Sequence, residues 1–252
     1  MKQLSENKYE NARKLFHKNY PNLPEIFAVI EHLIPGQIWV NNEDEPTFCL
    51  VITNSPYCFI QGEINEEIFE ECFKLLKKKP MVKLVVEPNP QLDLAKFGFL
   101  SVSRRQYRYR DIHSKIPQYE NNSSYLIKKI EDIETFNLCL WKPLMTSIFG
   151  SAENYLKHGI GFILWDSNNK IIASESHGIP SKELVEVGTV THENYRNQKL
   201  STILCNHLIR HAIEKKLKPV WSCDDANFIS WKVAEKQGMD ELIKYTFYNW
   251  NK

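Results

Sequence analysis

The sequence predicts an α/β (α+β) fold in which helices pack on a mixed sheet. Over residues 125–250, strand-like apolar runs alternate with amphipathic segments of helical period, which is the order of a layered structure. Residues 64–79 form a further amphipathic segment between strand-like runs. The polar stretch over residues 112–124 is the best linker candidate. We therefore expect an N-terminal α/β domain over residues 1–118 and a second domain over residues 119–252.

The first part is expected to begin with helices and to continue with strands. Pro35 and Gly36 end the second helix, and Pro80 ends the third, whose last turn carries lysines that suit the negative end of the helix dipole. The expected helices cover residues 11–20, 23–33 and 64–79, and the expected strands cover residues 37–40, 47–53, 57–61, 81–86 and 99–109.

In the second part, turn residues mark the boundaries. The polar run 166–169 indicates a hairpin turn, and Gly238 is a typical left-handed helix end. The expected helices cover residues 134–158 for the most part, 200–215 and 226–237, and the expected strands cover residues 125–130, 160–165, 170–177, 183–191, 218–222 and 242–250.

Composition excludes several classes of protein. The chain of 252 residues has a net charge of +1, so no global field draws it to nucleic acid or to an acidic membrane. Residues 1–10 are polar and unlike a secretory signal, and no apolar run is long enough to span a bilayer. The six cysteines stand singly, which favours reduced, buried thiols and a cytoplasmic location.

No metal site is expected either. The cysteines form no CxxC pair, and the histidines lack a metal-binding spacing. His207 and His211 lie four positions apart on one expected helix, but no glutamate stands between them as in a zinc-protease motif.

Residues 104–110 mix arginine with tyrosine and glutamine. Such a pattern fits a nucleic-acid surface, or a strand whose arginine face is solvated. Because the net charge is close to zero, we favour the solvated strand and expect no nucleic-acid partner.

The junction between the strand over residues 183–191 and the helix from Leu200 is the strongest candidate site. The first amides of a helix lack intrahelical partners, and its dipole favours negative charge there. Arg196 and Lys199 lie in the intervening polar loop and add positive charge. The junction therefore predicts an anion site of the kind that binds phosphate.

The segment from Val185 to Met239 resembles the cofactor half of the GNAT superfamily of acetyltransferases. The family signature is Arg or Gln, two variable residues, Gly, a variable residue, then Gly or Ala at a helix start. The family also has a later Asn before a helix and a closing Lys-x-Gly. The matching residues are Arg196, Asn197, Gln198, Lys199, Leu200, Ser201, Asn227, Ser230, Lys236 and Gly238.

The whole chain resembles the GNAT branch of zwittermicin-resistance-type acetyltransferases, notably over residues 35–42 and at Trp221 and Cys223. Similarity to glycine N-acyltransferases is more distant. The resemblance implies a GNAT-type mixed central sheet flanked by helices in the C-terminal domain, preceded by a smaller α/β domain that shapes the acceptor site.

The resemblance implies the cofactor-binding residues, and position on the expected strand over residues 183–191 gives the candidate base, which shares one face with Gly188 and Val190. Glu186 is the favoured general base, with an ordinary surface glutamate as the alternative and with Glu183 and Asp224 as weaker candidates. Gly188 permits a local bulge or is a packing glycine. The expected cofactor-binding residues are Thr189, Val190, Thr191, Arg196, Asn197, Gln198, Lys199, Leu200, Ser201, Asn227 and Ser230.

Two departures from the family bear on these expectations. Lys199 and Ser201 replace the small residues that let the backbone approach the pyrophosphate. Ala234 stands where many members carry a tyrosine that protonates the departing thiolate, so another group or water must serve.

The implied function is transfer of an acetyl group from acetyl-CoA to an amine of a small molecule, by direct attack in a ternary complex. Acetyl-CoA is then a co-substrate. The alternatives are an N-acyltransferase that uses a longer acyl-CoA, and a catalytically impaired protein that binds coenzyme A. A covalent acyl-enzyme on Cys223 is less favoured, because the family transfers the acyl group directly.

Overall fold

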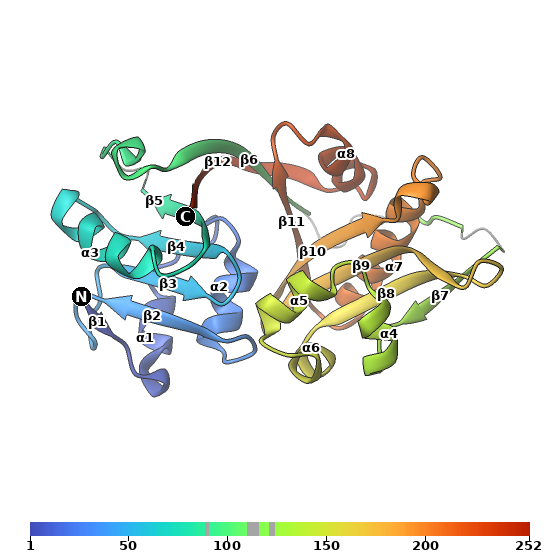
Figure 1. The fold of residues 1–252 in the computed structure, drawn as a ribbon, viewed down its shortest axis with the longest axis horizontal. Helices are drawn as coiled ribbons and strands as arrows, with labels where there is room; N and C mark the ends of the chain where they lie inside the picture. Colours follow the sequence, from blue (N-terminus) through green and yellow to red (C-terminus); the bar gives the residue numbers. More distant parts are fainter. Residues whose placement is uncertain (89–90, 110–115, 121–123) are drawn as a thin grey trace.

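The computed structural model describes residues 1–88, 91–109, 116–120 and 124–252. These residues form a 12-stranded mixed sheet flanked by helices (Figure 1). Its strand order is β1-β2-β3-β4-β5-β12-β6-β11-β10-β9-β8-β7. The predicted fold class is confirmed. Among the described residues, every helix is too short or too polar to cross a bilayer.

The first half of the chain supplies one end of the sheet. The expected helix over residues 11–20 is shorter than predicted, because the chain after Lys14 turns repeatedly and buries Phe16 and Tyr20. The elements are β1 (Lys2–Gln3), α1 (Glu10–Arg13), α2 (Leu23–Ile30), β2 (Gly36–Val40), β3 (Cys49–Thr53), β4 (Tyr57–Gln61), α3 (Glu66–Leu76), β5 (Met81–Glu87) and β6 (Leu100–Arg108).

The second half supplies the other end. The helical stretch over residues 134–158 divides into three helices, at an extended Cys139 and at Gly150, which has a φ of 81°. The elements are β7 (Tyr125–Lys129), α4 (Ile133–Leu138), α5 (Lys142–Phe149), α6 (Ala152–His158), β8 (Ile160–Asp166), β9 (Ile171–Pro180), β10 (Leu184–Thr191), α7 (Leu200–Glu214), β11 (Lys218–Asp224), α8 (Phe228–Lys236) and β12 (Asp240–Asn251).

The two halves share one order of elements. In each half three antiparallel strands are followed by a helix and by a strand parallel to the third: β2-β3-β4, α3, β5 in the first, and β8-β9-β10, α7, β11 in the second. The last strands are exchanged. The first half's β6 pairs with β11, and the chain's final strand β12 pairs with β5.

The β6–β12 pair therefore joins the halves, and Figure 1 shows it arching between them. The proposed domain boundary between residues 118 and 119 stays a prediction. β6 precedes this boundary in the chain and β12 follows it, and their pairing makes the sheet continuous. Most of the proposed linker lies outside the described residues.

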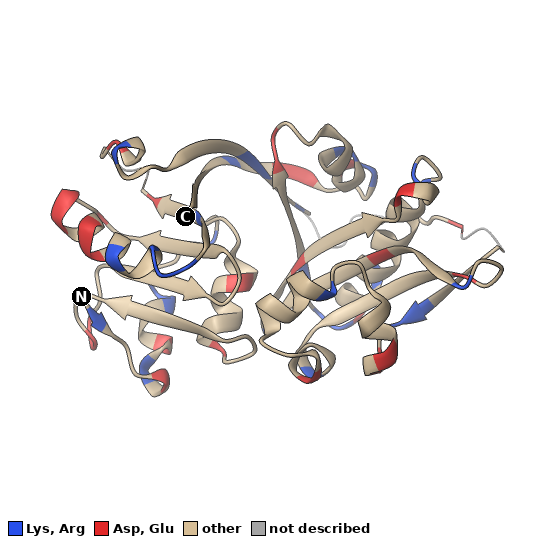
Figure 2. Cartoon of the chain, in the orientation of Figure 1, with Lys and Arg blue, Asp and Glu red and all other residues tan. Residues whose placement is uncertain are grey.

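The expected solvated arginine face on β6 is wrong, because β6 is an inner strand of the sheet. Arg104 is buried, donates to Asp224 at 2.5 Å, and lies over the Phe247 ring at 4.4 Å. Arg105 pairs with Asp225 and with Glu241. In Figure 2 lysine and arginine are interspersed with acidic residues along the ribbon. Arg110 lies outside the described residues.

Candidate active site

A groove of about 380 Å³ opens between β10, β11 and the starts of α7 and α8. We call it the α7 groove. Its lining contains every residue predicted to bind the cofactor, together with four residues outside that predicted set. The lining residues are Thr189, Val190, Thr191, Tyr195, Arg196, Asn197, Gln198, Lys199, Leu200, Ser201, Trp221, Asn227, Ile229, Ser230 and Val233.

The start of α7 presents free backbone amides to this groove. Its N-cap residue, Lys199, is left-handed with a φ of 61° and makes no side-chain cap bond. The amide of Ile203 is the first to bond within the helix, to the Lys199 carbonyl, so the amides before it have no intrahelical acceptor. The left-handed backbone explains why glycine suits this position in the family. Exposed Arg196 adds a cation at the edge of the groove.

Two tyrosines hold the loop that precedes α7. The Tyr195 hydroxyl donates to Asp166 Oδ2 at 2.8 Å and accepts from Asn169 Nδ2 at 3.0 Å. The Tyr125 hydroxyl donates to Gln198 Oε1 at 2.8 Å. The sequence indicated the turn at residues 166–169, but no local pattern shows that this turn anchors a loop far along the chain.

The opposite wall of the groove comes from the start of α8. Asn227 caps this helix, because its side chain accepts from the Ser230 amide at 3.2 Å. The Ser230 hydroxyl accepts from the indole of buried Trp221 at 3.1 Å. Both residues therefore shape the wall. Ala234 lies in the core and does not line the groove.

The floor of the groove is an open strand edge. Pairing between β10 and β11 ends at Glu186 and Val220, although β10 continues to Thr191. The Ser176 and Ser174 hydroxyls donate to the carbonyls of Gly188 and Val190, which therefore point toward β9.

Because successive carbonyls along a strand alternate in direction, the backbone groups of Thr189 and Thr191 face the open side toward β11. Val190 lines the groove as well, but its carbonyl faces β9.

Gly188 is a packing glycine and not a bulge. β9 and β10 pair without a register shift from Val185 to Thr191. A Cβ built on Gly188 would lie 2.8 Å from the Trp141 ring. Glycine therefore leaves room for this indole beside β10.

A second cavity, of about 120 Å³, lies next to the groove along β10, and residues of both halves line it. We call it the seam cavity. Glu186 lines it and is only 8% exposed, so the surface-glutamate alternative is wrong. Burial raises the pKa of Glu186 to about 7, although Ser222 and the charge of Arg104 offset part of the effect. A carboxyl group with this pKa can accept a proton near neutral pH.

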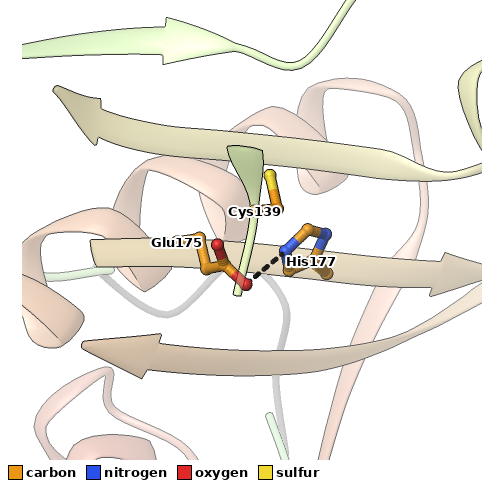
Figure 3. Close-up of side chains that lie close together, drawn as sticks. All are labelled: Cys139, Glu175 and His177. Carbon is orange, nitrogen blue, oxygen red and sulfur yellow. Dashed lines mark ion pairs between the residues drawn. The ribbon is translucent and has the colours of Figure 1, made fainter. Parts of the chain in front are cut away.

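Beside the seam cavity, a buried hydrogen-bond network fixes Trp141, and Figure 3 shows two members of this network, Glu175 and His177. The Glu175 carboxylate accepts the amides of Leu140 at 2.8 Å and Trp141 at 2.6 Å. His177 Nε2 lies 3.3 Å from Glu175, and its Nδ1 lies 2.7 Å from the Tyr155 hydroxyl. The network thus holds the indole that packs on Gly188.

Cys139, Glu175 and His177 also bring their potential ligand atoms within 4.8 Å of one another, an arrangement that sequence spacing did not indicate. Both Glu175 oxygens already accept backbone amides. The cluster is therefore accounted for as part of the hydrogen-bonded core.

Comparisons with known proteins agree with this architecture. A model of the GNAT acetyltransferase family matches residues 13–248. The uncharacterized N-acetyltransferase YdfB of Bacillus subtilis (strain 168) is 22% identical in an alignment of 265 positions that covers 98% of each chain.

Two solved structures share the fold over nearly the whole chain. A GCN5-related N-acetyltransferase-like protein from Streptococcus suis 89/1591 matches with a TM-score of 0.75 at 19% identity, covering 97% of this chain and 99% of that one. A tandem GNAT protein from the clavulanic acid biosynthesis pathway matches with a TM-score of 0.63 at 12% identity, covering 99% and 97%. The zwittermicin-resistance-type branch stays a prediction. The family match spans most of the chain, which therefore belongs to the GNAT acetyltransferase family and is an acyltransferase.

Proposed function

We propose that the protein moves an acetyl group from acetyl-CoA directly to an amine of a small molecule. The observation that carries the proposal is the continuity of two cavities along β10. Val187 and Gly188 line the seam cavity, and the next residue, Thr189, lines the α7 groove. Donor and acceptor can therefore meet at Gly188 and Thr189.

The residues of the groove fit coenzyme A. The pyrophosphate would lie at the start of α7, where Leu200, Ser201 and Thr202 offer free amides and Arg196 adds a cation. The amide groups of the pantetheine arm would bond to the open edge of β10 at Thr189 and Thr191. Half-buried Thr189 and exposed Ile229 show that this edge and its rim are accessible.

Bound acetyl-CoA supplies the activated acyl carbon, and the protein supplies the base and the orientation. Glu186 accepts a proton from the acceptor's ammonium group, directly or through a water molecule. The freed nitrogen then bonds to the acyl carbon while the carbon–sulfur bond breaks, and the second proton of the nitrogen passes through a water molecule to the departing sulfur. Buried Ala234 has no proton to donate, so a water molecule protonates the sulfur.

Direct transfer is favoured over a covalent acyl-enzyme. Cys223 is the thiol nearest in sequence to the groove residues of β11, but it is buried and lines neither cavity. Burial raises the pKa of its thiol, which opposes formation of the nucleophilic thiolate.

Binding and turnover can be tested separately. Acetyl-CoA should raise the melting temperature, because a ligand of the native state stabilises it by mass action. Release of free thiol in the presence of an amine panel then reports turnover, and butyryl-CoA and octanoyl-CoA test for a longer acyl group. No thermal shift at saturating acetyl-CoA would refute the proposal. A shift without thiol release for any amine would favour the impaired CoA-binding protein.

A further inference from the structure

We propose that the seam cavity binds the ammonium group of a small apolar monoamine, and that Glu25 of α2 is a specificity-determining residue for this acceptor. The inference rests on the proposed function and adds the chemical class of its acceptor. Three features of the cavity support it: carboxyl oxygens without a hydrogen-bond partner, more acidic than basic side chains in the lining, and an apolar wall.

Two buried carboxyl groups from different halves of the chain line this cavity. Glu25 is 2% exposed and Glu186 is 8% exposed. Glu25 Oε2 and Glu186 Oε2 are both buried without a hydrogen-bond partner among the described residues. A buried acceptor atom without a donor is costly, so both carboxyls are suited to a ligand that brings N–H groups. Asn22 and Tyr57 of the first half lie in the same lining.

The charges around the cavity favour a cation. Arg104 is the only lysine or arginine in the described lining, and its guanidinium already pairs with Asp224 at 2.5 Å and donates to Tyr245 at 3.4 Å. His177 is held between Glu175 and Tyr155. The two carboxyl groups of Glu25 and Glu186 thus remain available to bind one cationic ligand.

The wider surroundings do not neutralise the two carboxyls. Lys83 lies over the Tyr57 ring at 5.5 Å, and Arg108 donates to the Lys18 carbonyl. Neither cation lines the cavity, so both act on the two carboxyl groups from outside it. Burial, and to a smaller degree the charge of Glu186, raise the pKa of Glu25 to about 8. An ammonium between the two carboxyls would relieve this repulsion.

The remaining wall limits the rest of the acceptor. It is apolar and comes mainly from α5 and β9, with Trp141, Leu144, Met145, Ile148 and Ile179. A second charge on the acceptor would lose its hydration here without compensation. The small volume of the cavity, about 120 Å³, limits the acceptor to the ammonium and a short hydrocarbon body.

An α-amino acid fits this cavity poorly. Its carboxylate would lie two bonds from the ammonium and would face Glu25 and Glu186. The carboxylate of the amino acid would then lie close to these two carboxyl groups, and like charges that lie close together in a desolvated site repel strongly. The preferred acceptor is therefore an amine without an adjacent carboxylate.

The experiment uses pairs of acceptors that differ only in that carboxylate: 3-methylbutylamine against leucine, and phenethylamine against phenylalanine. Initial rates of thiol release from acetyl-CoA give kcat/KM for each. The wild-type protein should prefer each amine over its amino acid by at least about tenfold, the effect of one uncompensated charge contact. Equal or better use of the amino acids would overturn the inference.

The variant Glu25→Gln keeps the shape of the side chain but cannot ionise when the ammonium group binds. It should raise the KM for 3-methylbutylamine by about tenfold or more and leave the thermal shift by acetyl-CoA unchanged. Glu25→Asp keeps a carboxyl group on a shorter side chain and should raise this KM by a smaller factor. Glu66→Gln, an exposed change on α3, is the matched control. An unchanged KM in a folded Glu25→Gln protein would overturn the role of Glu25.

Failure of this inference differs from failure of the proposed function. If acetyl-CoA raises the melting temperature but neither amine is acetylated, the acceptor assignment is wrong and the cofactor groove stands. If acetyl-CoA produces no shift, the proposed function itself fails.

Discussion

The two halves of the chain repeat one topology but differ where the cofactor groove would lie. In the first half, β4 and β5 pair along their whole shared length, from Tyr57 and Lys83 to Gln61 and Glu87. In the second half, pairing between β10 and β11 ends after three residue pairs, at Glu186 and Val220, and the strands separate. The first pair leaves no open strand edge, and the second leaves one for a ligand.

The helices α3 and α7, which follow β4 and β10, also differ in how their first turns could bind a ligand. The first turn of α3 is closed by the Asn65 side chain, which accepts from the Ile68 amide, and carries Glu66 and Glu67. The first turn of α7 has no side-chain cap and no acidic residue, and Arg196 precedes it. Topology alone therefore does not distinguish the two halves. The end of strand pairing and the chemistry of the helix cap distinguish the proposed phosphate site from the corresponding place in the first half.

The largest expected effect concerns Glu186, which lies where β10 and β11 separate. Glu186→Gln should lower kcat by about 10²–10⁴-fold, because loss of a general base typically has an effect of that size. The apparent dissociation constant for acetyl-CoA should change little. Initial rates at saturating acceptor measure the first quantity, and thermal-shift titration measures the second.

The matched control is Glu183→Gln, an exposed glutamate just before the same strand, which should keep normal turnover. Normal turnover of the Glu186→Gln protein would remove this residue from the mechanism.

Cofactor affinity tests the difference between α7 and α3 directly. Arg196→Glu should weaken acetyl-CoA binding by about 10–100-fold, because it removes a charge-assisted contact and adds repulsion. Lys215→Glu makes the same charge change at the far end of α7 and should have little effect. Calorimetric titration should also give one acetyl-CoA per chain. A second site of similar affinity would show that the halves are equivalent after all.

The seam between the halves should make stability depend on pH. Burial raises the pKa of Glu25 to about 8 and that of Glu186 to about 7, from an ordinary value of 4.5. The native protein therefore binds more protons than the unfolded chain between about pH 4.5 and 8, and its stability falls as the pH rises through this window.

Glu25→Gln should reduce this fall by more than about 1 kcal/mol between pH 5 and 8, since one pKa unit corresponds to about 1.4 kcal/mol. Urea unfolding at both pH values measures it, with Glu66→Gln as the control. A slope equal to that of the wild-type protein would mean that Glu25 is ionised or solvated in the native state.

The α7 groove was more predictable from the sequence than the seam cavity, for a physical reason. The groove residues lie on two strands, one loop and two helices, and local signals such as the polar loop before Leu200 indicate most of them. The seam cavity joins Glu25, Arg104 and Glu186, which no local pattern relates.

Strand exchange was unpredictable for the same reason. Residues 99–109 were expected to form a strand, and β6 confirms it, but its place between β11 and β12 depends on pairing across more than a hundred residues. That place is what buries Arg104, whose sequence context suggested a solvated face.

The smallest expected effect concerns the residue that departs most clearly from the family signature. Lys199 has a φ of 61°, a conformation that costs a non-glycine residue about 1 kcal/mol or more. Lys199→Gly should therefore stabilise the fold, by about 1 kcal/mol or less after the extra entropy of glycine in the unfolded chain is counted. Thermal or urea unfolding measures the change.

Lys216, with a φ of 64° beyond the end of α7, is the matched control, because Lys216→Gly relieves the same strain far from the groove. Both glycine variants should gain stability, and only the change at 199 should alter acetyl-CoA affinity. Lys199→Ala then separates the effect of the lysine charge from the effect of the left-handed backbone, because it removes the charge and keeps the strain. If Lys199→Gly and Lys199→Ala lose affinity equally, the lysine charge contributes to phosphate binding. If the glycine variant binds as tightly as wild type, the backbone amides of α7 suffice, and the departure from the family glycine affects stability alone.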